Sequence, residues 1–151
     1  MREHLLLGAL AAFLLGSSAG ANPPPSLGNR NIHVIVDVNV NTWSSQWVSS
    51  GAFVDSGTVD PGREATPHGA ATMVSGPLHG ANGSFTWEFV AAYTGPLNGG
   101  RYRTQGSWTM IDGTGAYEGI SGRGTITGWW DQSTKDFHSE FVGTVDCPNC
   151  P

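Results

Sequence analysis

A single carboxylate between two large aromatic residues is the position in this sequence with the clearest potential for chemistry. Glu88 lies between Trp87 and Phe89, in a segment where aromatic residues alternate with others. If Glu88 faced an apolar interior, burial would raise its pKa and make it a candidate general acid. The alternation favours the other register, in which the aromatic residues face the interior and Glu88 points to solvent.

Two arginines on a neighbouring predicted strand could complement this carboxylate. Arg101 and Arg103 are two positions apart, so their side chains share one face of a strand. They could pair with Glu88 or hold an anionic ligand. A solvated ion pair between strands is the simpler expectation.

The chain contains six tryptophans, which are the second group of residues that could contact a ligand. Large rings line pockets for small apolar molecules, but they also fill the narrow interior of a small barrel, and both interpretations stay open. Trp129 and Trp130 are adjacent, so a regular strand points them to opposite faces. The residues predicted to contact a ligand are Trp87, Phe89, Tyr93, Trp108, Trp130, Glu88 and Arg103.

The two cysteines form the segment Cys147-Pro148-Asn149-Cys150. In an exported protein we expect them to close a small disulfide in the C-terminal tail. A redox role would need a helix that begins at the pair and lowers the pKa of a thiol, and no helical pattern is apparent there. A zinc site would need a second pair of ligands, which the sequence does not offer.

No metal site, cofactor or nucleophile is predicted. The stretch from Asp37 to Asn41 matches the start of a calcium loop, but it lacks the turn glycine and the closing glutamate. His68 and His79 do not have a zinc spacing. No Gly-x-Ser-x-Gly elbow occurs, and catalytic residues therefore stay unassigned.

Short strands must position these side chains. Glycine recurs every few residues among threonine, valine and aromatic residues, and no segment places apolar residues at helical spacing. Residues 60–69 are predicted to be a loop, Asn82-Gly83 a type I′ hairpin turn, and Pro77 an edge or bulge position. The predicted strands are 32–41, 47–59, 70–79, 84–94, 101–112, 120–130 and 137–146, with an eighth if one long segment divides at a glycine. This pattern predicts an all-β fold, a single antiparallel closed barrel of about eight strands.

One glycine-rich turn resembles a known family. The segment Asp112-Gly113-Thr114-Gly115-Ala116-Tyr117, followed by Gly119, resembles the Gly-Thr-Gly-aromatic signature of the allene oxide cyclase and dirigent-like barrel superfamily, which includes secreted bacterial members. The similarity covers about residues 106–128, and dirigent proteins usually carry phenylalanine where Tyr117 stands. The resemblance implies an eight-stranded, calycin-like barrel that holds a hydrophobic substrate during cyclisation or radical coupling. It also allows a homo-oligomer, because dirigent-like barrels often form trimers. The motif itself is a structural turn, formed by Gly113, Gly115, Tyr117 and Gly119, so no catalytic residue carries over.

The first residues are typical of a targeting segment. An apolar run from Leu5 to Leu15 is too short to span a bilayer, and Ala19-Gly20-Ala21 has the form of a signal-peptidase site. We expect a signal peptide over residues 1–21, cleaved after Ala21, and a secreted or periplasmic protein. An irregular leader (22–31), the barrel domain (32–146) and the Cys-x-x-Cys tail (147–151) should follow.

Charge limits the choice of partner. The chain has 7 Lys and Arg against 12 Asp and Glu, a net charge of −5, and lacks the clustered cations that nucleic-acid binding requires. No further segment is apolar and long enough to cross a membrane after cleavage. The favoured function is binding of a small apolar molecule in the barrel mouth or lumen. The alternatives are a cyclase, isomerase or dirigent-like protein, and a structural or surface-interaction module with a filled barrel.

Overall fold

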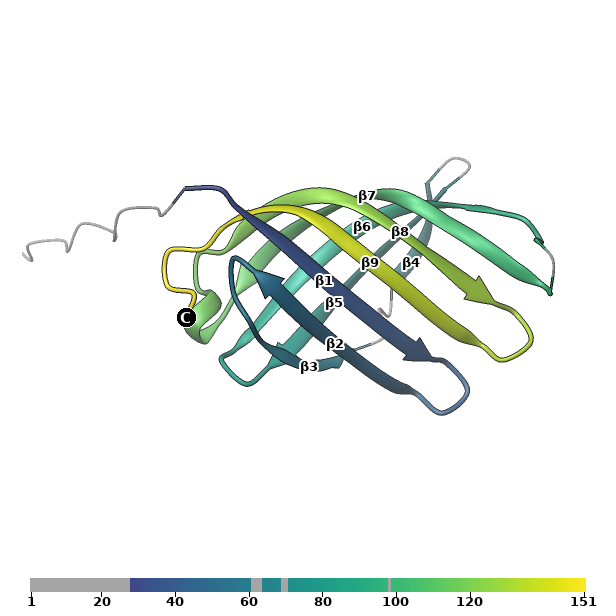
Figure 1. Cartoon of the computed structure of the whole chain (residues 1–151), viewed down its shortest axis with the longest axis horizontal. Coiled ribbons are helices and arrows are strands. Elements are labelled where there is room, and N and C mark those ends of the chain that lie inside the picture. The colour runs from purple at the N-terminus through teal and green to yellow at the C-terminus, as the bar shows by residue number, and fades with distance from the viewer. Residues whose placement is uncertain (1–27, 61–63, 69–70, 98) are drawn as a thin grey trace, which may run out of the picture.

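The computed structural model describes residues 28–60, 64–68, 71–97 and 99–151, which form a single antiparallel β-barrel (Figure 1). The expected signal peptide and the leader up to residue 27 lie outside the described residues. The elements are β1 (Arg30–Asn39), β2 (Ser44–Gly51), β3 (Ser56–Val59), β4 (Glu64–His68), β5 (Ala71–Gly80), β6 (Ser84–Thr94), β7 (Arg101–Gly113), the 3-10 turn η1 (Gly115–Tyr117), β8 (Ser121–Asp131) and β9 (Asp136–Asp146).

Closure of the barrel confirms the predicted fold class. The strands pair in the order β3-β2-β1-β9-β8-β7-β6-β5-β4, and β3 also pairs with β5, which closes the ring. β3 and β4 contact successive parts of the same edge of β5, so together they occupy one of eight strand positions. The eighth strand arises as expected, because the predicted segment 47–59 divides after Gly51 into β2 and β3.

The prediction of a loop over residues 60–69 was wrong, because β4 forms there and pairs with β5. The interruption between β3 and β4 explains how Pro77 is accommodated in the middle of β5. The backbone N–H of Asp60 donates to the Pro77 carbonyl at 3.0 Å. In a strand, the backbone N and O of one residue point to the same side. The nitrogen of Pro77, which carries no hydrogen, therefore faces the interruption between β3 and β4, as its carbonyl does. Pro77 therefore lies at a local break in the pairing rather than at a free edge.

The Asn82-Gly83 turn joins β5 to β6 as predicted, but its type differs. Gly83 has a φ of 146°, whereas Asn82 is not among the described residues with positive φ. A type I′ turn needs positive φ at both central positions, so the predicted turn type was wrong.

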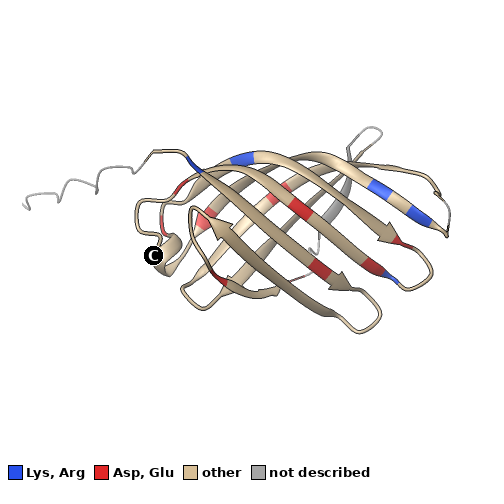
Figure 2. Cartoon of the chain, in the orientation of Figure 1, with Lys and Arg blue, Asp and Glu red and all other residues tan. Residues whose placement is uncertain are grey.

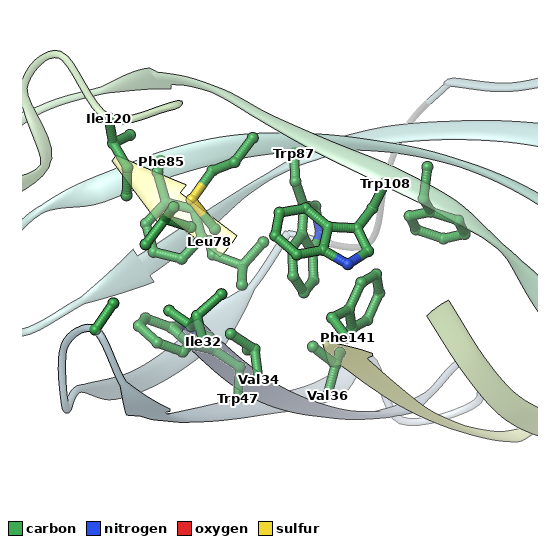
Figure 3. Close-up of a cluster of buried hydrophobic side chains, with 14 of the residues drawn as sticks. Ile32, Val34, Val36, Trp47, Leu78, Phe85, Trp87, Trp108, Ile120 and Phe141 are labelled. Atoms are coloured by element: carbon green, nitrogen blue, oxygen red, sulfur yellow. The ribbon is translucent and has the colours of Figure 1, made fainter. Parts of the chain in front are cut away.

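Strict alternation puts one face of each strand into the core. On β6, Phe85, Trp87, Phe89 and Ala91 are buried, whereas the residues between them lie on the outer face. The same alternation on β1 buries Ile32, Val34 and Val36. Figure 3 shows Phe85 and Trp87 of β6 inside the barrel with Ile32, Val34 and Val36 of β1. Burial of such apolar surface is the main stabilising term of this fold.

Candidate functional site

One end of the barrel lies near η1 and the C-terminus (Figure 1), and buried side chains fill it. The rings of Phe53, Phe85 and Tyr117 contact one another, with centroids 4.9 to 5.8 Å apart. Ile120 and Cys147 are buried beside them. This end of the barrel is therefore closed by a packed aromatic cluster.

The glycine-rich turn positions Tyr117 in this cluster. A side chain at position 113 would overlap the backbone carbonyl of Tyr117, and Gly115 has a φ of 63°. Only glycine permits the close approach at position 113, and glycine readily adopts the left-handed backbone at position 115. The turn thus directs Tyr117 inward, where it is fully buried.

A carboxylate ties the closed end together. The Tyr117 hydroxyl donates to Asp55 Oδ2 at 2.5 Å, and the Asp55 carboxylate also accepts from the backbone N–H groups of Ser56, Ala81 and Asn82 at 2.7 to 3.2 Å. Burial raises the pKa of Asp55, but these hydrogen bonds outweigh it and the net shift is downward. Burial and the Asp55 carboxylate raise the pKa of the Tyr117 hydroxyl. Three connections between strands are therefore joined at one side chain.

Stacked aromatic side chains divide the barrel at mid-height (Figure 3). The rings of Trp87 and Phe141 stack with centroids 3.7 Å apart, and Trp108 lies 6.2 Å from Trp87. The Trp108 indole N–H donates to the Thr125 carbonyl at 3.0 Å, which satisfies its one polar group. This layer forms a floor between the closed end and the opposite end.

Above this floor the barrel interior is a cavity of about 590 Å³. Valines on β1, β3 and β5 form one part of its wall, and aromatic residues of β6 to β9 form the other. The aromatic lining consists of Trp87 and Phe141 at the floor, Phe89 and Phe137 in the wall, and Trp43, Tyr93, Tyr102 and Trp130 towards the mouth. Its size and apolar lining are typical of sites for small molecules.

Polar groups of the cavity are few. Asp60 and Gln132 contribute to the lining, together with Tyr93 and Tyr102, each of which carries one hydroxyl. Burial raises the pKa of Tyr93, so its phenol stays neutral and able to donate a hydrogen bond. Among the described residues, no lysine or arginine lines the cavity. The described lining residues therefore offer no cation to an anionic ligand, and the nearest described one shown is Lys135, whose Nζ lies 5.7 Å from the centroid of the Trp130 ring.

The structure brings together four of the seven residues predicted to contact a ligand. Trp87, Phe89, Tyr93 and Trp130 line the cavity. Trp108 lies in the core beside Trp87 and is not part of the lining.

Glu88 and Arg103 are the two remaining predicted residues, and neither lines the cavity. Each alternates with buried neighbours and lies on the outer face of its strand. This is the register that the alternation favoured, and it removes the basis for Glu88 as a general acid inside the barrel.

Sequence reasoning missed other lining residues. Val38, Val59 and Val74 line the cavity, as do Tyr102 and Phe137. Their inward direction follows from alternation, but their meeting at one end depends on how the strands are staggered.

Charged residues are scattered over the strands, as Figure 2 shows. Arg101 donates to Asp131 at 3.1 Å and its guanidinium lies 4.4 Å from the Trp129 ring, so it does not pair with Glu88. Trp129 faces outward while Trp130 lines the cavity, as their adjacency predicted.

Cys147 and Cys150 form a disulfide with their Cα atoms 5.5 Å apart. Within the described part of the chain, no group of three or more His, Cys, Asp or Glu side chains is placed to hold a metal. The same residues include no helix with the length and apolar character needed to cross a membrane.

Comparison with models of known protein families found no match to this chain. Comparisons with the curated proteins and with the solved structures also found none. The function must therefore be argued from the site itself.

Proposed function

We propose that this protein binds a small, mostly apolar molecule in the cavity at the open end of the barrel. The observation that carries the proposal is a cavity of about 590 Å³ with apolar walls, set above an aromatic floor in a barrel whose other end is closed. Transfer of apolar surface from water into such a site is favourable, and aromatic walls provide large contact area. The signal peptide expected over residues 1–21 would place this binding outside the cytoplasm.

The two alternatives have less support. A filled structural barrel disagrees with a cavity of this size. A cyclase or isomerase would be favoured by an ionisable group aimed at the substrate. Glu88 and Arg103 lie on the outer face. The carboxylate of Asp60 contributes to the lining, but its side chain is 62 % exposed and lies 3.6 Å from the His79 imidazole. Relationship to the allene oxide cyclase and dirigent-like superfamily stays a proposal, supported by the closed eight-stranded barrel and by the turn that ends at Tyr117.

A neutral fluorescent naphthylamine probe tests the proposal directly. Its fluorescence should rise on titration with the protein and saturate at one probe per chain. The variant Val38→Trp adds an indole inside the cavity and should weaken binding at least tenfold. The matched control Val48→Trp changes a valine of the neighbouring strand β2 whose side chain is 49 % exposed, and should bind as the wild type does.

Equal binding by both variants would locate the probe outside the barrel and contradict the proposal. Circular dichroism checks that Val38→Trp folds. Native mass spectrometry of protein purified from its host would report a retained small molecule and the number of subunits in one measurement, which also tests the proposed homo-oligomer.

A further inference from the structure

Three aromatic residues form one row on the inner face of the cavity wall. Trp130 of β8 pairs with Tyr102 of β7 on one side and with Phe137 of β9 on the other. All three residues line the cavity, and none of them is fully buried. Residues that pair directly across a sheet have their Cβ atoms only about 4.5 to 5.5 Å apart. The three side chains therefore form a continuous aromatic wall.

An aromatic wall favours a positive charge over a negative one. The face of an aromatic ring carries partial negative charge, so it attracts a cation that lies within about 6 Å of the ring centroid. One such contact is present in the structure, because the Lys135 ammonium lies 5.7 Å from the centroid of the Trp130 ring. Lys135 itself is not among the residues that line the cavity. A ring of the wall is therefore already within reach of an ammonium group.

Asp60 is the only acidic residue of the described lining, and it lies across the barrel from the aromatic row. It directly follows β3, and three strands separate β3 from β8 in each direction around the closed ring. Two strands related in this way lie on opposite sides of the interior. The Asp60 carboxylate lies 3.6 Å from the His79 imidazole, which is charged only when it is protonated. A cation in the cavity would therefore have aromatic rings on one side and a carboxylate on the other.

We infer that the ligand is a hydrophobic organic cation whose nitrogen carries alkyl groups and lies between the aromatic row and Asp60. This inference rests on the proposed function. A primary ammonium has three N–H donors that need acceptors, and the described lining offers few. A quaternary nitrogen has no such donors, and aromatic walls are a common way to recognise it. A carboxylate does not fit, because the described lining contains a carboxylate of its own and no lysine or arginine.

Three probes of similar length test the inference. The first is the choline ester of a medium-chain fatty acid, and the second is the 3,3-dimethylbutyl ester, in which an uncharged carbon replaces the quaternary nitrogen. The third is a fatty acid carboxylate of the same length. Affinity is measured by displacement of the naphthylamine probe and by calorimetry. The wild type should bind the cation about three- to tenfold more tightly than the neutral ester, and the carboxylate most weakly.

Two variants remove the groups that recognise the charge. Trp130→Leu removes one ring of the row but keeps an apolar side chain, and Asp60→Asn removes the carboxylate charge but keeps its shape. Each should roughly halve the ratio of cation affinity to neutral-ester affinity, and the double variant should bring it to about one. Because the two esters have the same shape, a general change in the volume of the cavity affects both and cancels in the ratio.

Trp129→Leu and Glu88→Gln are the matched controls. They remove an indole and a carboxylate that do not line the cavity, and Glu88→Gln changes the net charge of the chain as Asp60→Asn does. Both controls should keep the ratio of the wild type, and circular dichroism checks that every variant folds.

Three results would each overturn the inference and leave the proposed function intact. They are equal affinity of the wild type for the cation and the neutral ester, tightest binding of the carboxylate, and a ratio that survives in the double variant. Failure of every probe to bind, the naphthylamine included, would overturn the proposed function and this inference with it.

Discussion

Removing the hydroxyl of Tyr117 tests how the closed end of the barrel is held. The variant Tyr117→Phe keeps the ring between Phe53 and Phe85 and removes only the hydrogen bond to Asp55. A hydrogen bond to a charged group contributes about 1.5 to 3 kcal/mol. Asp55 keeps three backbone donors in the variant, so we expect the lower value, about 1.5 kcal/mol. For a domain of this size that loss lowers the Tm by roughly 5 °C.

The pH dependence of this difference has a defined sign. The pKa of Asp55 is lowered in the folded state, so its contribution is present above the unfolded carboxyl pKa of about 4 and is lost as pH falls through the lower folded value. The pKa of Tyr117 is raised, so its contribution is present below about pH 10 and is lost as pH rises through the raised folded value. The difference in stability between wild type and variant should therefore be constant between about pH 4 and pH 10 and shrink in acid.

Thermal unfolding followed by circular dichroism at pH 7 and below pH 3 measures both effects. Asp55→Ala is the stronger variant, because it also leaves the three backbone N–H groups without their acceptor and should cost about 3 kcal/mol. A double-mutant cycle with Tyr117→Phe then isolates the coupling between the two side chains. Equal Tm values of Tyr117→Phe and wild type at pH 7, or a difference that grows in acid, would refute this account. Binding of the naphthylamine probe should not change, because the Trp87 and Phe141 rings separate the closed end from the cavity.

Three further predictions address the floor, the tail and the leader. Phe141→Ala removes one ring of the floor and should lower the free energy of unfolding by about 3 to 5 kcal/mol, measured by chemical denaturation. Probes longer by a few methylenes should gain affinity in this variant. An unchanged preference for probe length would contradict the position of the floor. Reduction of the Cys147–Cys150 disulfide opens a loop of four residues and should lower stability by about 2 kcal/mol with no effect on probe binding, which melts with and without reductant will show. Mass spectrometry of protein secreted by its host should find Asn22 as the first residue, and an intact N-terminus would disprove cleavage after Ala21.

Local pattern was sufficient to predict most strands of the barrel. The alternation around Trp87 specified both the strand and its inner face, because side chains in a strand repeat every two residues. The same repeat of two predicted that Glu88 lies outside the barrel and that Trp129 and Trp130 point to opposite faces of their strand. These conclusions need only the chain direction and the rule that apolar faces are buried.

Other features depend on pairing between distant residues. β4 forms only because β5 offers it an edge at Ala71 to Ser75, and nothing in a segment rich in proline and glycine signals that edge. The turn at Asn82 adopts a different type because Gly83 also packs against the backbone of Thr114, 31 residues further along the chain. Such contacts override local turn preferences, so the sequence predicted the position of the turn but not its geometry.

The glycines of β8 and β9 show why the cavity itself could not be predicted. A Cβ added at Gly124 or Gly143 would lie 2.7 to 2.8 Å from the indole of Trp108, so that ring occupies the space these glycines leave and helps to form the floor. Gly128 lies on the same inner face of β8 as Gly124, but its neighbours on β7 and β9 are the small residues Thr104 and Ser139, and a Cβ added there would lie 2.7 Å from the Ser139 hydroxyl. The same residue type thus makes room for a large ring at one height and for a serine hydroxyl at another. The stagger of β7 against β8 decides which occurs, because it sets the height at which Trp108 crosses the interior.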